Sequence, residues 1–181
     1  RTPLRSGIQS IESRRGASSH QLNPFFILSD KNANEEYGNV YGFNLVYSGN
    51  FSGGVEVDSM FQSRAWMGIN GYDFSWILEA GDSFTSPETV MVYSSHGFGE
   101  MSRTYHKLYR TRLVRGKYRD AVRPILVNNW EATYFDFTED KILDLAKEAA
   151  DLGIELLVLD DGWFGKRNDD WSSLGDWFVD S

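Results

Sequence analysis

Short apolar runs separated by turn-forming residues fill the chain from residue 22 to about residue 96. The runs at 25–28, 40–47, 65–67 and 90–93 have the length of strands. Turn residues lie between them, at 29–32, 48–50, 53–54, 70–73 and 81–82. Asn70-Gly71 predicts a tight hairpin, because both residue types tolerate positive φ. Short strands with frequent turns predict an antiparallel β-sandwich.

A helical period replaces the strand pattern after Gly97. Apolar side chains then recur at steps of three and four residues, at Phe98, Met101, Tyr105, Leu108 and Tyr109. This spacing predicts a helix over 98–114, which we interpret as a connection between two domains. Its aromatic stripe is expected to pack in a core.

The last third of the chain predicts a strand, a helix and a parallel strand. The apolar runs at 124–127 and 154–159 are typical of strands buried on both faces. Between them, Thr138 is an expected helix N-cap and Gly153 an expected left-handed stop. The helix would place four residues on its apolar face: Ile142, Leu145, Ala146 and Ala149. Together these elements predict one βαβ unit.

The residues after the first of these strands reduce the number of folds that this βαβ unit could belong to. They are Asn128-Asn129-Trp130-Glu131, so the glycine-rich turn of a dinucleotide-binding fold is missing. A (β/α)8 barrel remains, with its active site at the carboxyl ends of the strands. Only two of eight strands are visible, so the unit must continue elsewhere. We expect a partial β-sandwich over 1–97, a helical connection over 98–120 and a truncated barrel over 121–181.

Composition excludes several classes of protein. The chain is 41% hydrophobic and 24% charged, which is typical of a globular protein. Its net charge of −8 disfavours a nucleic-acid partner. No apolar run is long enough for a membrane span. The chain has no cysteine, which fits a cytoplasmic location. His20, His96 and His106 lack metal-ligand spacing, so we expect no metal site at these residues.

Carboxylates and indoles follow both predicted barrel strands: Trp130 after the first, and Asp160, Asp161 and Trp163 after the second. Ionised carboxylates at the end of a buried strand need partners, and sugar hydroxyls are suitable ones. An indole can pack on the apolar face of a sugar ring. Two other interpretations stay open, a helix cap at Asp160 and an ordinary turn at Asp161-Gly162.

Asp160 and Asp161 are unsuited to be a hydrolytic pair. Retaining glycosidases hold two carboxyl groups about 5–5.5 Å apart on either side of one glycosidic bond. Adjacent residues of a strand point to opposite faces, so at most one of the two would face a barrel axis. We therefore interpret both as substrate-binding residues.

Two segments resemble bacterial family 36 α-galactosidases. Residues 123–135 (RPILVNNWEATYF) and 156–165 (LLVLDDGWFG) closely resemble the start of that family's barrel. Residues 13–25 (SRRGASSHQLNPF) are similar to its N-terminal domain, and the chain from Gly97 onward resembles its interdomain stretch. The likeness spans nearly the whole chain.

The resemblance implies the C-terminal part of an antiparallel β-supersandwich, followed by the first βαβ unit of a (β/α)8 barrel. It implies retaining hydrolysis of terminal α-galactosides such as melibiose and raffinose, without a cofactor and often in a tetramer. By resemblance, Trp130 borders a galactose pocket, Asp160 and Asp161 bind hydroxyls, and Trp163 shapes the site. The family's nucleophile lies in a later Lys-Trp-Asp motif that is absent here, so this piece holds no catalytic residue and should be inactive.

Three other functions remain open from the residues. The first is a carbohydrate-binding module, which predicts sugar affinity within residues 1–120. The second is a related transferase that moves galactose to another sugar. The third is a structural interaction domain, which predicts no sugar contact at Trp130 or Asp160.

Overall fold

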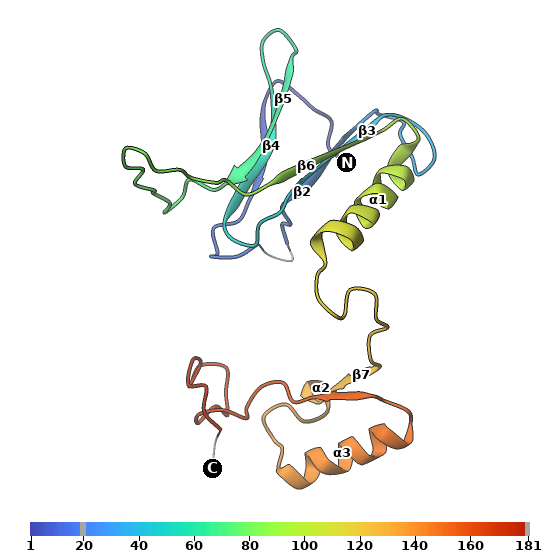
Figure 1. Ribbon diagram of the computed structural model, residues 1–181, viewed down its shortest axis with the longest axis vertical. Helices are drawn as coiled ribbons and strands as arrows, with labels where there is room; N and C mark the ends of the chain where they lie inside the picture. The colour runs from blue at the N-terminus through green and yellow to red at the C-terminus, as the bar shows by residue number, and fades with distance from the viewer. Residues whose placement is uncertain (19–20, 180–181) are drawn as a thin grey trace. The chain divides into compact units, whose positions relative to one another are not determined.

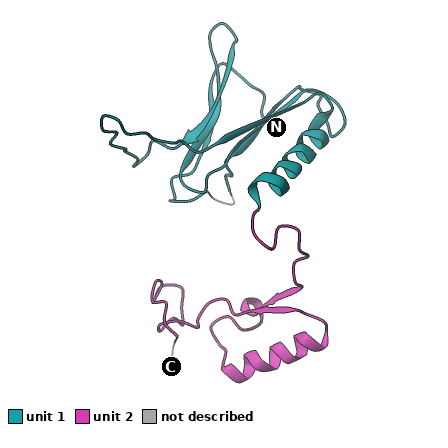
Figure 2. Ribbon diagram, in the orientation of Figure 1, with its two compact units in different colours: residues 1–114 teal, residues 115–181 magenta. Residues whose placement is uncertain are grey.

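The computed structural model describes residues 1–18 and 21–179, which fall into two compact units. Unit 1 is Arg1–Val114 and unit 2 is Arg115–Ser181 (Figure 2). The division lies within the stretch 98–120 that was expected to connect two domains, whereas the expected boundaries themselves stay predictions. His20 lies outside the described residues.

Unit 1 contains two three-stranded antiparallel sheets (Figure 1). The first has the strand order β1 (Gly7–Glu12), β4 (Phe51–Val57), β5 (Ser63–Ile69). The second has the order β2 (Phe25–Ser29), β3 (Val40–Leu45), β6 (Thr89–Ser94). The predicted strands near residues 25, 40, 65 and 90 are confirmed, and the sequence pattern missed β1 and β4.

The predicted turn at Gly53-Gly54 is wrong, because both glycines lie inside the central strand β4. Gly54 pairs with Ser10 of β1 and with Trp66 of β5. A Cβ atom at Gly54 would collide with the carbonyl oxygen of Gln9 and lie 2.8 Å from the Trp66 ring. The glycine is therefore required by close approach within the sheet and does not mark a turn.

The predicted hairpin at Asn70-Gly71 is also wrong. Strand β5 ends at Ile69, and the next strand begins only at Thr89 and belongs to the other sheet. The Asn70 side chain is buried, and its amide donates to Glu12 Oε2 at 2.9 Å and to the Phe51 carbonyl oxygen at 3.2 Å. Asn70 thus ties together the ends of the first sheet.

The predicted helix is confirmed as α1 (Gly97–Leu108), continued by the single π-helical turn η1 (Tyr109–Leu113). Met101 and Tyr105 are buried in one cluster with Ala33 and Val40, so the aromatic stripe packs in the core as expected. The Tyr105 hydroxyl donates to the Val90 carbonyl oxygen at 3.0 Å. The helix therefore belongs to the body of unit 1.

Unit 2 contains the predicted βαβ arrangement. Strands β7 (Leu126–Asn128) and β8 (Leu156–Val158) are parallel, and α3 (Glu139–Asp151) connects them after the short helix α2 (Trp130–Thr133). The Thr138 hydroxyl accepts the Lys141 N–H at 3.4 Å and caps α3, as predicted. Gly153 has a φ of +83°, the left-handed conformation expected after the helix.

Both strands are partly exposed within the described residues, whereas their apolar runs predicted burial on both faces in a barrel. Ile125, Leu126 and Leu156 are 60%, 51% and 41% exposed. A two-stranded sheet with one connecting helix has too few neighbours to cover the side chains of both faces. Unit 2 consequently presents apolar strand surface that a larger barrel would cover.

Candidate functional site

The polar residues predicted at the strand ends meet at one edge of the β7–β8 sheet. Asn128, the last residue of β7, lies opposite Val158, the last residue of β8. Its side-chain amide donates to Asp160 Oδ2 at 2.5 Å, and its Oδ1 accepts the Trp130 N–H at 2.8 Å. One asparagine therefore links two of the predicted site residues.

Asn129 fixes the same edge from within. Its side chain is fully buried. Its Oδ1 accepts the Asp160 N–H at 2.8 Å, and its Nδ2 donates to Thr133 Oγ1 at 2.9 Å. The Asn129 N–H itself donates to the Val158 carbonyl oxygen at 3.2 Å. A buried amide with all these partners holds the backbone of Asp160 against the end of β7.

Two indoles lie beside these residues. The Trp163 Nε1–H donates to the carbonyl oxygen of Asp160 at 3.1 Å. The Trp130 ring packs edge-on against Tyr134 and Phe135, with centroids 5.3 and 4.9 Å apart. Both indoles are partly exposed, as a stacking surface for a sugar ring requires.

Asp161 has a different environment from Asp160. It forms a two-pronged ion pair with Arg167, with Nε to Oδ1 at 2.6 Å and Nη2 to Oδ2 at 2.8 Å. The Asp161 side chain is 22% exposed, whereas Asp160 is an exposed residue. The bonds from Arg167 hold the pKa of Asp161 below its ordinary value, and the Gly162 N–H contributes to the same effect. The lowered pKa keeps Asp161 ionised as a carboxylate.

The two aspartates thus lie near the strand ends but contact different partners, Asn128 and Arg167. Phe135 connects the two halves of the cluster, because its ring contacts Trp130 and also lies 5.8 Å below the Arg167 guanidinium. All four predicted residues belong to this cluster, which we call the strand-end cluster: Asn128, Asn129, Trp130, Phe135, Asp160, Asp161, Trp163 and Arg167.

Arg167 was missed from the sequence. Its neighbours Asp169 and Asp170 are typical of solvated loop charges, and no sequence pattern distinguishes the arginine from them. The available signal was a lone arginine six residues after an aspartate pair, within an aromatic and glycine-rich loop. Such a cation is a natural partner for a carboxylate that is drawn away from water.

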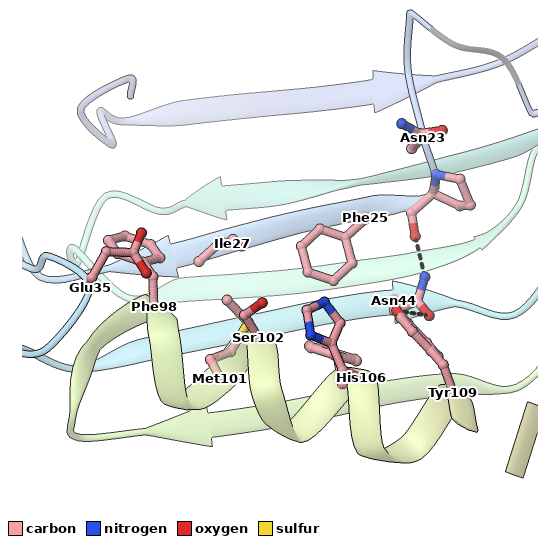
Figure 3. Close-up of a pocket in the computed structure, with 12 residues that line it drawn as sticks. Asn23, Phe25, Ile27, Glu35, Asn44, Phe98, Met101, Ser102, His106 and Tyr109 are labelled. Atoms are coloured by element: carbon pink, nitrogen blue, oxygen red, sulfur yellow. Dashed lines mark hydrogen bonds between the residues drawn. The ribbon is translucent and has the colours of Figure 1, made fainter. Parts of the chain in front are cut away.

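Unit 1 has a hollow of about 660 Å³ beside α1, shown in Figure 3. Phe25, Ile27 and Met101 provide apolar lining. The polar groups of Asn44 are already engaged, since its amide donates to the Pro24 carbonyl oxygen and its Oδ1 accepts the Tyr109 hydroxyl at 2.9 Å. The hollow thus offers a ligand less polar recognition than its lining residues suggest.

Two features, a metal-binding group of side chains and a membrane-spanning helix, are not found among residues 1–18 and 21–179. In these ranges no group of three or more His, Asp and Glu side chains is placed to hold a metal ion. No helix within them combines the length and the apolar character needed to cross a bilayer.

The two units define a β-sandwich followed by the opening of a (β/α)8 barrel. Residues 1–79 match the glycosyl hydrolase family 36 N-terminal domain, and residues 83–181 match the melibiase family. The chain belongs to the melibiases of glycosyl hydrolase family 36.

Individual relatives agree with this assignment. The chain is 64% identical to alpha-galactosidase AgaA of Geobacillus stearothermophilus over 99% of its own length and 25% of the relative's. The crystal structure of a variant of that enzyme in complex with raffinose matches with a TM-score of 0.93 and 63% identity, over 98% of this chain and 25% of the other. An alpha-galactosidase from Lactobacillus brevis matches with a TM-score of 0.94 and 51% identity, over 98% and 24%. The chain therefore spans about a quarter of the length of these relatives.

Proposed function

We propose that the protein containing these residues hydrolyses terminal α-galactosides with retention of configuration. In this proposal the strand-end cluster binds the galactose ring. One observation carries the assignment: the parallel pair β7–β8 gathers carboxylates and indoles at its carboxyl edge, where a barrel forms its active site. The names of the relatives, and the raffinose bound to one of them, support an α-galactoside as substrate.

Each side chain has a role that its environment permits. Asp160 is exposed and receives one amide donor on Oδ2, which leaves Oδ1 for sugar hydroxyls. Asp161 is held as an anion and is also able to accept from a hydroxyl. Trp130 provides an aromatic face beside them, and Trp163 shapes the backbone of Asp160.

The bond-breaking steps need two further carboxyl groups. One attacks the anomeric carbon while the other protonates the leaving oxygen, and water then releases galactose from the covalent intermediate. In the proposal neither group is Asp160 or Asp161, because these are bound to Asn128 and Arg167 and act on hydroxyls. Contacts to hydroxyls that strengthen as the ring distorts lower the barrier.

Replacement of Asp161 in the full-length protein tests this assignment. We expect Asp161→Ala to lower kcat/KM for an aryl α-galactoside about 100-fold, because a charged hydrogen bond to substrate contributes roughly 1.5–3 kcal/mol. Asp136→Ala is the matched control, since the Asp136 side chain is 94% exposed and, within the part of the chain that the structure describes, forms its ion pair with Lys141 at 3.2 Å. An unchanged kcat/KM for Asp161→Ala would show that Asp161 does not act on substrate.

Product analysis separates hydrolysis from transfer. With raffinose as substrate we expect free galactose and sucrose. Larger oligosaccharides as the main products would instead assign the protein as a transferase. A homotetramer and a cytoplasmic location also belong to the proposal, and sedimentation and cell fractionation test them.

A further inference from the structure

We infer that Arg167 is a positioning residue that aims Asp161 at one hydroxyl group of the bound sugar. The inference rests on the proposed function and concerns a residue that the sequence pattern did not single out. Arg167 needs no contact with substrate in this role, because it acts through the Asp161 carboxylate.

The geometry of the carboxylate supports this role. A carboxylate offers about four acceptor positions, two on each oxygen. Asp161 Oδ1 accepts from Arg167 Nε at 2.6 Å and from the Gly162 N–H at 2.7 Å, and Oδ2 accepts from Arg167 Nη2 at 2.8 Å. Three positions are thus used by partners within the described residues, and one position on Oδ2 remains. The Asp161 side chain is 22% exposed, and in this inference the remaining position receives a hydroxyl.

Arg167 is itself fixed from several sides. Its side chain is 6% exposed, and its Nη1 donates to the Ser172 carbonyl oxygen at 2.8 Å. The guanidinium lies over the rings of Phe135 and Phe164, at 5.8 and 5.7 Å from their centroids. A planar fork held in this way can set the plane of a carboxylate, which a lysine cannot do.

The contact with Phe135 extends the arrangement to the aromatic side of the cluster. Phe135 lies under Arg167 and packs edge-on against the Trp130 indole. The carboxylate that binds a hydroxyl and the indole that borders the ring are thereby built on a common support. A merely structural ion pair would hold the loop together without favouring any one hydroxyl group.

A double-mutant cycle in the full-length protein tests the inference. Arg167→Met removes the cation, and Asp161→Asn keeps the shape of the side chain it serves. We expect Arg167→Met alone to lower kcat/KM on an aryl α-galactoside about 100-fold. In the Asp161→Asn background the same change should lower it less than about threefold, because the two residues act as one unit.

A set of monodeoxy galactosides gives a readout that a structural role would not move. In the wild type, removal of the hydroxyl that Asp161 binds should reduce kcat/KM more than removal of the others. In Arg167→Met and Arg167→Lys this selective penalty should shrink, as it does in Asp161→Asn. Arg167→Lys retains a buried cation, so it decides the question if Arg167→Met does not fold.

The control is Arg119→Met, which breaks the exposed ion pair of Arg119 with Asp120 in the same unit and should leave the pattern unchanged. Equal losses of kcat/KM from Arg167→Met in the wild-type and Asp161→Asn backgrounds would overturn the inference. A loss of kcat/KM in Arg167→Met that is the same for every deoxy substrate would also overturn it. Both results would leave the proposed function intact. An inactive wild-type protein would instead contradict the proposed function, and the inference with it.

Discussion

Gly54 shows how a single missing side chain sets the packing of the first sheet. A Cβ atom there would meet the backbone of β1, with the Cα of Ser10 at 2.9 Å. Because backbone cannot move aside easily, we expect Gly54→Ala to destabilise the protein by about 1–3 kcal/mol. Gly68→Ala is the matched control, since Gly68 lies in β5 of the same sheet and a Cβ there would meet nothing within 4 Å. Thermal unfolding measures both, and equal melting temperatures would contradict the argument.

Tyr105 makes the stability of the unit 1 core depend on pH in the alkaline range. Burial is the main cause that raises the pKa of Tyr105 to about 12, from an ordinary value of 10.0. Between these values the unfolded chain loses the phenol proton and the folded chain keeps it. The stabilisation is therefore complete below pH 10 and is lost as pH rises toward 12.

We expect the free energy of unfolding to fall across this window, as measured by denaturant titrations at several pH values. Tyr105→Phe cannot ionise and should weaken the dependence on pH. It should also be about 1 kcal/mol less stable at neutral pH, because it loses the hydrogen bond to Val90. Identical pH profiles for the two proteins would disprove the assignment.

At the scale of elements, local sequence patterns predicted two kinds of element. These are the strands with a clear apolar pattern and the helices with clear apolar spacing or clear end signals. Strands β2, β3, β5 and β6 and helices α1 and α3 follow from such signals. Strand β4 was missed because its glycines serve close packing with β1, which is distant in sequence and therefore invisible to a local pattern. The hairpin predicted at Asn70-Gly71 was wrong for the same reason, since the Asn70 partners Glu12 and Phe51 are distant in sequence.

The cluster at the ends of β7 and β8 could be predicted because parallel strands bring their carboxyl ends together. Trp130, Asp160, Asp161 and Trp163 lie in the short segments that follow those strands. The roles of Asn129 and Arg167 depend on a hydrogen bond to the next strand and on the path of a loop. Neither depends on a sequence period, so spacing alone could not assign them.

The N-cap of α3 depends on residues that are close in sequence, Thr138 and Lys141, so it can be tested by itself. Thr138→Ala removes the hydroxyl that accepts the Lys141 N–H, and we expect a loss of about 1 kcal/mol in the free energy of unfolding. Thr138→Ser keeps the hydroxyl and should retain most of the stability. Denaturant unfolding compares the three proteins, and a serine variant as unstable as the alanine variant would contradict the capping role.

At the scale of the whole molecule, the two units differ in how far they bury their own apolar surface. Unit 1 packs a helix on one sheet and encloses Val40, Leu45, Phe51 and Met101 almost completely. Among the described apolar side chains of unit 2, Ala149 and Phe164 are the buried ones, and its strands leave Leu126 and Leu156 exposed. The chain spans 25% of the length of AgaA. We therefore expect unit 2 to depend on further barrel strands for its stability.

Expression of residues 1–181 alone tests this dependence. We expect the isolated polypeptide to bind a hydrophobic dye such as ANS strongly, because the apolar strand surface of unit 2 is open to solvent. We also expect no turnover of an aryl α-galactoside, since retaining hydrolysis needs two carboxyl groups placed on either side of one bond. The full-length protein should hydrolyse the substrate and bind little dye. Measurable turnover by residues 1–181 would show that Asp160 or Asp161 does chemistry, and would replace their assignment as binding residues.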